Sequence, residues 1–189
     1  MNNWHQDQPP FVLHAGTEPL LVSMPHVGTY LPPAIAARLT VEAHRVPDTD
    51  WHLDRLYAFA KEMGASILMA THSRYVVDLN RPSDNTSLYP GQCVTTLCPL
   101  DTFDDALLYL EGMAPDAAEI AARVSANWHP YHQQLRAELA RNHVRRCRRR
   151  TAEVVLEPEL RSPIASAVAR QVKHIDRRLT RDRGRSAGR

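Results

Sequence analysis

Residues 73–91 read SRYVVDLNRPSDNTSLYPG, a short apolar run followed by a loop rich in Pro, Ser, Asp and Asn. The apolar run 75–77 predicts a strand, and Asp78, Asn80 and Arg81 follow at its end. In an open α/β sheet, ligands bind beyond the carboxyl ends of the strands. The cluster therefore predicts a binding site, and the alternative is a strand end capped by an Asp–Arg ion pair.

Two arginines, Arg74 and Arg81, flank this predicted strand. A guanidinium group holds a carboxylate through two parallel hydrogen bonds, so the pair favours a ligand with carboxylate groups. A second strand is predicted at residues 19–24, and His26 follows it in the sequence PHVGT. At the carboxyl end of this strand, His26 is placed to bind a metal ion or a substrate, with a purely structural role as the alternative.

Residues 48–63 predict a helix that starts at Asp48 or Thr49 and ends before Gly64. Residues 65–70 predict a strand that is buried on both faces, because the run is almost wholly apolar. A strand, a helix and a strand in this order form a βαβ unit with parallel strands. The predicted buried stripe of the helix consists of Trp51, Leu56, Phe59, Ala60 and Met63.

The same predicted helix begins with three acidic residues, Asp48, Asp50 and Asp54. The helix dipole explains one or two acids in a first turn. Asp50 and Asp54 are four residues apart and share a face, where like charges repel unless a cation lies nearby. The alternative is therefore that one of these carboxylates binds a metal ion.

The remaining elements are a short helix, a long loop and a long helix. Residues 31–39 predict a helix with prolines in its first turn, and residues 88–103 predict an ordered loop that covers the site. A long helix is predicted from Pro115 onward, interrupted near Asn127 because Pro130 lacks a backbone donor. Its predicted apolar stripe consists of Ile120, Val124, Trp128 or Tyr131, Leu135 and Leu139.

The composition is that of an ordinary globular domain. The 189 residues suffice for one domain with a core, and 43% of them are hydrophobic. No apolar run approaches the length of a membrane span, and the first residues lack the pattern of a secretion signal. Three cysteines, which cannot all pair, favour a reduced, cytoplasmic protein. The sequence does not indicate an oligomeric state.

Charge is distributed unevenly along the chain. Residues 1–140 contain 8 Lys and Arg against 16 Asp and Glu, whereas residues 141–189 contain 15 against 5. Such a basic end suits an anionic surface or nucleic acid, but no recognition motif accompanies the arginines, so base recognition is not expected. Within it, residues 154–156 predict a strand and residues 163–179 a helix, and the last ten residues are expected to be disordered.

Several motifs, in order, resemble those of the N-formylglutamate amidohydrolase (N-formylglutamate deformylase) family. They are PHVGT at 25–29, DTDWHLD at 48–54, SRYVVDLNRP at 73–82, LYPGQ at 88–92 and WHPYH at 128–132. The resemblance covers residues 10–143, which suggests a domain of this family at 1–143 and a divergent basic tail at 144–189. It implies a three-layer α/β/α fold with a mostly parallel mixed sheet, similar to the zinc carboxypeptidases.

The resemblance also implies a reaction and a cofactor. The reaction is hydrolysis of N-formyl-L-glutamate, a small dicarboxylate, to L-glutamate and formate in histidine degradation. The cofactor is a divalent metal ion, zinc or cobalt, that activates water. An amide needs a nucleophile stronger than neutral water, and the two carboxylates of this substrate would occupy two arginines.

Carried over by position, the resemblance implies roles for five residues. His26 resembles the first metal ligand, and because the glutamate of the carboxypeptidase motif is absent here, we infer Asp50 as the acidic ligand. Asn80 and Arg81 resemble the Asn-Arg pair that holds a substrate carboxylate, and Arg74 would hold the second carboxylate. No residue is assigned as the catalytic acid or base.

The sequence departs from the family after about residue 143. Family members are longer and have, after the long helix, an Asp-x-His-Ser motif that supplies another ligand, whereas residues 154–160 read VVLEPEL. His26 and one carboxylate are fewer ligands than a catalytic zinc site ordinarily has. The fold is therefore expected to be incomplete at the C-terminus. Three interpretations stay open: an active deformylase, a non-catalytic truncated homologue, and a protein that binds anions or nucleic acid through its basic tail.

Overall fold

The computed structural model describes residues 8–86 and 96–153 of the chain. Contacts divide the chain into a unit of residues 1–146 and a unit of residues 147–189, and only the end of one helix is described in the second. The site and the core lie in the first unit. The LYPGQ motif and the elements predicted at 154–156 and 163–179 lie outside the described residues.

A three-stranded mixed sheet forms the centre of the first unit. β1 (Phe11–His14) pairs antiparallel with β3 (Ser66–Ala70), and β3 pairs parallel with β2 (Leu21–Met24), which gives the order β1-β3-β2. The strands predicted at 19–24 and 65–70 and their parallel pairing are confirmed. β1 is not predicted from the sequence, because its apolar run is short and its pairing partner β3 lies about 50 residues further along the chain.

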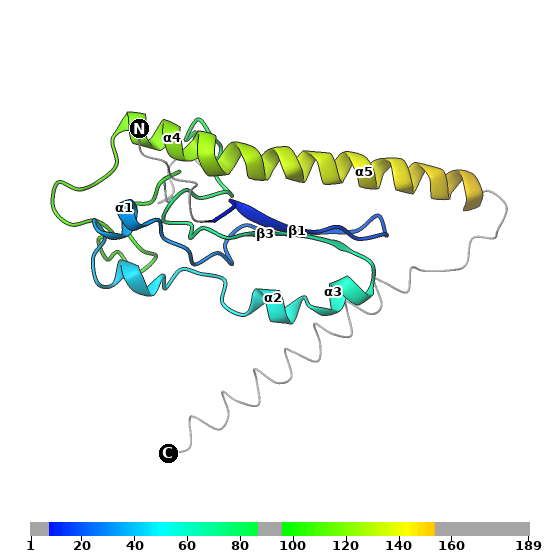
Figure 1. Ribbon diagram of the computed structural model, residues 1–189, viewed down its shortest axis with the longest axis horizontal. Helices are drawn as coiled ribbons and strands as arrows, with labels where there is room; N and C mark the ends of the chain where they lie inside the picture. Colours follow the sequence, from blue (N-terminus) through cyan, green and yellow to red (C-terminus); the bar gives the residue numbers. More distant parts are fainter. Residues whose placement is uncertain (1–7, 87–95, 154–189) are drawn as a thin grey trace, which may run out of the picture. The chain divides into compact units, whose positions relative to one another are not determined.

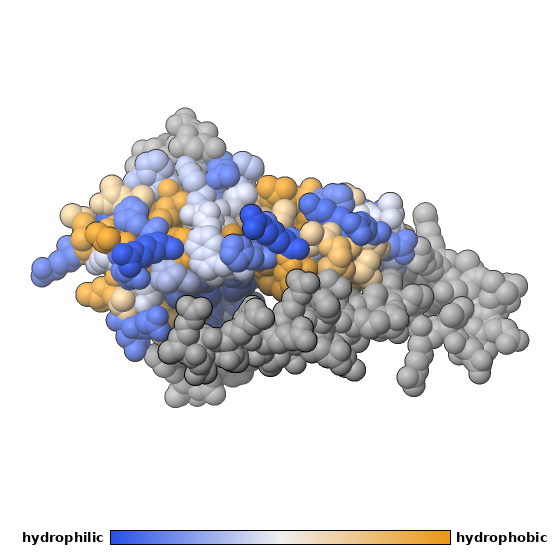
Figure 2. All heavy atoms as spheres, turned by 90° about the horizontal axis from the view of Figure 1, so that it is seen from below, coloured by the Kyte–Doolittle hydropathy of each residue, from blue (hydrophilic) through white to orange (hydrophobic). Residues whose placement is uncertain are grey.

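Helices lie on both sides of this sheet (Figure 1). The elements over one face are α4 (Ala117–Arg123), the π-helical segment η2 (Val124–Trp128) and α5 (His129–Glu153), and those over the other are α2 (Leu53–Leu56) and α3 (Phe59–Glu62). Figure 2 shows the molecule from the α2–α3 side, where hydrophilic and hydrophobic side chains are mixed. No described helix is long and apolar enough to cross a membrane.

β3 is buried on both faces, as its apolar sequence predicts. Leu68 packs with Val124 and Tyr131 beneath the long helix, whereas Ile67 packs with Ala60 on the opposite face. A third core cluster closes one end of the unit, around α1 (Pro33–Ala36) and η1 (Ala43–Arg45). It contains Ile35, Leu39, Ala43, Val46, Tyr75, Val76, Leu108 and Tyr109.

The long helix changes its winding where the sequence predicts an interruption. Asp116 caps its start and accepts a hydrogen bond from the Glu119 backbone N–H at 2.8 Å. In η2, the backbone N–H of His129 bonds to the carbonyl of Val124, five residues back. A wider π turn of this kind accommodates Pro130, which has no N–H to donate. The helix is therefore not broken, and it continues as α5.

The prediction of a single helix over residues 48–63 is wrong in its extent. Two short helices, α2 and α3, take its place, because His52 has a left-handed conformation (φ 65) immediately before α2. The break changes which side chains face the sheet. Leu53 packs in the core, whereas Trp51 (53% exposed) and Leu56 (38% exposed) face solvent, so the predicted buried stripe is wrong at these two positions.

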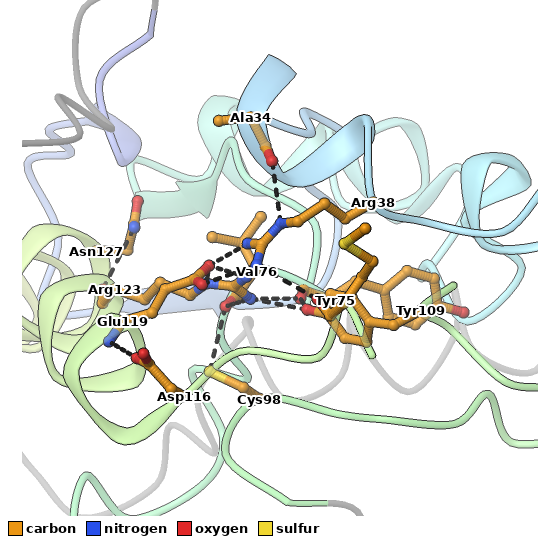
Figure 3. Close-up of polar contacts among 11 residues, drawn as sticks. Ala34, Arg38, Tyr75, Val76, Cys98, Tyr109, Asp116, Glu119, Arg123 and Asn127 are labelled. Atoms are coloured by element: carbon orange, nitrogen blue, oxygen red, sulfur yellow. Dashed lines mark hydrogen bonds and ion pairs between the residues drawn. The ribbon is translucent and has the colours of Figure 1, made fainter. Parts of the chain in front are cut away.

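Residues 74–76 form a buried turn and residue 77 follows it without strand pairing, so the strand predicted at 75–77 is also wrong. All three side chains are buried, which explains why the run resembles a strand. The carbonyl oxygens of Tyr75 and Val76 accept hydrogen bonds from the side chain of Arg123, at 3.4 Å and 3.1 Å, where a strand would bond to its neighbour (Figure 3).

Candidate active site

His26 lies just beyond the carboxyl end of β2, as the sequence predicts. The turn after it approaches the chain beyond β3 so closely that a Cβ at Gly28 would collide with backbone atoms of Thr71 and His72. The Tyr30 N–H donates to the carbonyl of Thr71 at 3.0 Å and holds the two segments together. Only glycine permits this approach. The contact between the two segments fixes the turn that carries His26.

Asp50 is bonded to His26 through the backbone, because its N–H donates to the His26 carbonyl at 3.0 Å. Its side chain is 45% exposed, and Oδ2 lies 3.9 Å from Nδ1 of His26. Two non-glycine residues with left-handed backbones, Val46 (φ 44) and His52 (φ 65), flank it along the chain. Such conformations are costly, and they concentrate at functional sites, where the surrounding structure enforces them.

Asp78 is the buried centre of the cluster, with no exposed surface. Its Oδ1 accepts hydrogen bonds from His26 Nε2 and from the Asn80 backbone N–H, both at 2.8 Å. Its Oδ2 accepts one from Arg74 Nη2 at 2.6 Å and lies 3.9 Å from Arg81 Nε. Burial alone would raise the pKa of Asp78, but the bond to His26 and the charge of Arg74 outweigh it and lower the pKa to about 2.

The charge of Asp78 decides which nitrogen of His26 carries the proton. An ionised carboxylate can only accept, so Nε2 of His26 donates to it. In neutral imidazole, Nδ1 then has a lone pair. That nitrogen lies 3.9 Å from a carboxylate oxygen of Asp50, so two electron-rich atoms are neighbours. A proton or a cation between them would stabilise this arrangement.

The two arginines are placed differently. Arg74 is only 7% exposed, and its guanidinium lies over the ring of Phe103, 4.5 Å from the centroid. Phe103 ends the loop that was predicted to cover the site, and its N–H donates to Asp48 Oδ2 at 3.1 Å. Arg81 is half-buried and Asn80 is exposed, so these two are accessible to a ligand. The predicted substrate contacts of all three residues stay predictions.

Four of the five predicted site residues, His26, Arg74, Asn80 and Arg81, thus lie around Asp78, and Asp50 adjoins this cluster through His26. Asp78 belongs to the cluster singled out in the sequence, but no role is assigned to it there. The Asp–Arg ion pair considered as the alternative is present as well, between Arg74 and Asp78. The sequence signal for Asp78 was its place at the end of the apolar run, two residues before Asn80. A carboxylate at this position agrees with both interpretations, because it forms an ion pair with Arg74 and also orients the imidazole of His26.

A cleft of about 420 Å³ opens beside Asp50. Its volume is within the range of small-molecule sites. Its walls combine apolar residues from β1 and β3 with polar residues from the segment before α2. The lining residues are Val12, Val27, Thr29, Thr49, Asp50, Trp51, His52, Asp54, Arg55, Met69 and Ala70.

The described residues do not contain a group of three or more His, Cys, Asp or Glu side chains that could hold a metal ion. His26 and Asp50 are nevertheless donors of the types that bind zinc and related ions. The hydrogen bond from His26 Nε2 to a buried carboxylate is also the usual environment of a metal-binding histidine. These residues therefore fit part of a metal site.

A model of the N-formylglutamate amidohydrolase family matches residues 18–153, which include every residue of this cluster. The chain belongs to the N-formylglutamate amidohydrolase family. It is 55% identical over 126 residues to an N-formylglutamate deformylase of Pseudomonas aeruginosa and 47% identical over 128 residues to one of Pseudomonas putida. These matches cover 67% and 68% of this chain but 47% and 48% of the relatives, so the chain spans about half their length.

Two solved structures agree with this chain in fold. The crystal structure of N-formylglutamate amidohydrolase from Ralstonia eutropha JMP134 superposes with a TM-score of 0.58 at 26% identity, over 72% of this chain and 52% of that one. A protein from Agrobacterium tumefaciens superposes with a TM-score of 0.51 at 21% identity, over the same shares. The resemblance noted in the sequence and the α/β class are thereby confirmed. The similarity to carboxypeptidases stays a prediction.

Proposed function

We propose that this chain carries out, or forms part of a protein that carries out, metal-dependent hydrolysis of N-formyl-L-glutamate to L-glutamate and formate, a step of histidine degradation. The observation that carries the proposal is the His26 imidazole, held by Asp78 through Nε2 and lying with Nδ1 beside Asp50. Relatives named N-formylglutamate deformylase that are 47–55% identical to the chain support the choice of substrate.

The metal ion would be held by Nδ1 of His26 and the carboxylate of Asp50, with Asp78 orienting the imidazole. Bound there, zinc or cobalt supplies a Lewis acid and a water molecule of lowered pKa. A catalytic zinc site ordinarily has three protein ligands. A further ligand would come from outside the described residues or from the part of the relatives that this chain does not span.

The substrate carries two carboxylates and a formyl amide. We assign one carboxylate to Arg81 and Asn80, which are accessible beside the buried cluster. The second is assigned to Arg74, because a guanidinium has five N–H donors and the bond to Asp78 occupies one. Hydrolysis adds water to the formyl carbon, breaks the C–N bond and gives a proton to the leaving amine. Holding both carboxylates would orient the amide for this attack.

The test is formate release from N-formylglutamate by the purified chain, with zinc, cobalt or manganese supplied. We expect metal-dependent release that is lost in His26→Ala and Asp50→Asn. Glu111→Gln is the control, because Glu111 is an exposed carboxylate outside both the cluster and the cleft, and this variant should retain activity. Absence of formate with every metal would refute hydrolysis by this chain and leave its family membership untouched.

The second candidate is a non-catalytic homologue, which the presence of only two donors in the described cluster favours. The visible absorption spectrum of bound cobalt distinguishes the two. Cobalt bound through His26 without formate release would favour the non-catalytic homologue, whereas metal-dependent formate release would refute it.

A further inference from the structure

The segment that carries the candidate site is attached to the long helix by side chains. Beyond the carbonyls of Tyr75 and Val76, which Arg123 holds, the carbonyl of Leu79 accepts a hydrogen bond from His132 Nε2 at 2.8 Å. The carbonyl of Arg81 accepts one from Trp128 Nε1 at 2.9 Å. Three side chains of one helix therefore bind four carbonyls on both sides of Asp78.

We propose that Arg123, Trp128 and His132 are positioning residues that set the place of residues 75–81 and so hold Asp78 against His26. Their link to catalysis rests on the proposed function, but their effect on the His26–Asp78 pair does not. In the described part of the chain, residues 75–81 form no strand pairing, and their backbone is held at Asp78 by one bond from its N–H to the Leu97 carbonyl at 2.7 Å. The helix side chains supply the anchoring that a neighbouring strand would otherwise give.

The π-helical segment explains how these three side chains reach one target. Arg123 and Trp128 are five residues apart, and in an α-helix such side chains point about 140° away from each other, because each residue turns about 100°. A π turn, in which hydrogen bonds join residues five apart, contains more residues than an α turn, so the two side chains diverge less than they would in an α-helix. η2 lies between the two residues, so it brings Trp128 onto the face that Arg123 uses.

Trp128 and His132 also fix each other. Their rings stack with centroids 3.8 Å apart and an interplanar angle of 25°. The pKa of His132 is lowered, because burial disfavours its charged form more than the bond to Leu79 favours it. A ring held flat against Trp128 has one way to present Nε2, which is toward the carbonyl of Leu79.

Single substitutions can remove the donors and keep the rings. Trp128→Phe removes the indole N–H, and His132→Phe keeps an aromatic ring for stacking but removes the donor. His132→Gln restores a donor without a ring. His129→Phe is the control, because His129 is exposed and touches Trp128 edge-on, with centroids 5.3 Å apart.

The readout is the exchange rate of the His26 Nε2 proton, measured by NMR on the labelled full chain, with the unfolding temperature measured alongside. We expect the Trp128→Phe/His132→Phe double variant to exchange this proton about tenfold faster than the His129→Phe control, since two hydrogen bonds of ordinary strength are lost. Trp128→Phe alone should show a smaller change in the same direction, and His132→Gln should stay near the unsubstituted chain.

Equal exchange rates in the double variant and the control would overturn the proposal, and so would a His132→Gln variant that behaves like His132→Phe. Because this readout needs neither substrate nor metal, it separates the proposal from the proposed function. If formate is released, the double variant should lower the turnover number and also raise KM, because residues 75–81 include Asn80 and Arg81 as well as Asp78. If no formate is released, the exchange rates still decide whether the helix positions Asp78.

Discussion

Replacing Arg123 by methionine tests the network that holds the turn before Asp78. Arg123 has no exposed surface, and its guanidinium bonds to Glu119 as well as to the backbone of Tyr75 and Val76 (Figure 3). Nη1 also donates to the hydroxyl of Tyr109 at 2.9 Å. Methionine fills similar space but offers no donor, so the substitution removes all of these bonds together.

The expected loss of unfolding free energy depends on which hydrogen bonds each acceptor of Arg123 keeps after the substitution. A buried acceptor left without a donor costs about 1–3 kcal/mol. Three of the four acceptors keep some compensation, because Glu119 still binds Arg38, the Cys98 thiol still donates to Val76 at 3.4 Å and the Tyr109 hydroxyl still donates to Tyr75 at 3.5 Å. The lower end of the range therefore applies to each of the four acceptors, and we expect Arg123→Met to lower the free energy of unfolding by about 3–4 kcal/mol.

Urea unfolding and thermal unfolding measure this loss. For a unit of this size, about 3 kcal/mol corresponds to a fall of roughly 10 °C in Tm. Arg38→Met is the matched control, because the Arg38 side chain is 23% exposed and its loss leaves Glu119 paired with Arg123. It should cost about 1 kcal/mol. If Arg123→Met costs no more than the control, the buried network does not stabilise the fold and the reasoning is refuted.

Three further substitutions and treatments test other parts of the structure. Gly28→Ala should lower the free energy of unfolding by about 3 kcal/mol, because the new Cβ meets backbone atoms of Thr71 and His72; unchanged urea unfolding would contradict this close approach. Burial would raise the pKa of Glu119, but its bonds to Arg38 and Arg123 outweigh burial and lower it. The ionised carboxylate therefore stabilises the fold fully above the ordinary glutamate pKa of about 4.3, and this stabilisation is lost as the pH falls through the lower pKa of the folded state. Glu119→Gln should therefore flatten the fall of stability in acid, and parallel curves would disprove the link. Burial raises the pKa of the Cys98 thiol to about 11, so iodoacetamide should label its peptide only in urea; rapid labelling of the native chain, followed by mass spectrometry, would contradict the structure.

The parts of the fold that sequence predicts well are those in which the local pattern decides the structure. β2 and β3 are apolar runs of the right length, and the crossover between them leaves no choice but parallel pairing. The position of His26 follows directly, because it comes two residues after the last residue of β2. The approach of Asp50 to His26 was inferred from the family resemblance, and the structure places the two side chains 3.9 Å apart.

The run at 75–77 shows why the rest was not predictable. Its apolar residues indicate burial, but burial does not say which group binds the backbone. Here that group is Arg123, which is 48 residues away from Tyr75. The pattern of apolar residues in the long helix predicts which apolar side chains are buried, but it does not predict a buried arginine. The break before α2 is not predicted either, because left-handed backbones are uncommon in non-glycine residues and the enrichment of histidine among them is too weak to predict a break at His52.

The basic end of the chain begins inside the fold, and this changes what its charge can do. Arg141 and Arg145 belong to α5, and both donate to the carbonyl of Gly16, at 3.0 Å and 2.7 Å, just beyond the end of β1. Arg141 also bonds to Ser66 at the start of β3. The long helix is therefore bonded to the sheet at this end by arginines and at the other end by the donors that hold the site segment. Because these two charges are used within the fold, the excess left for an anionic partner is smaller than the composition of residues 141–189 suggests.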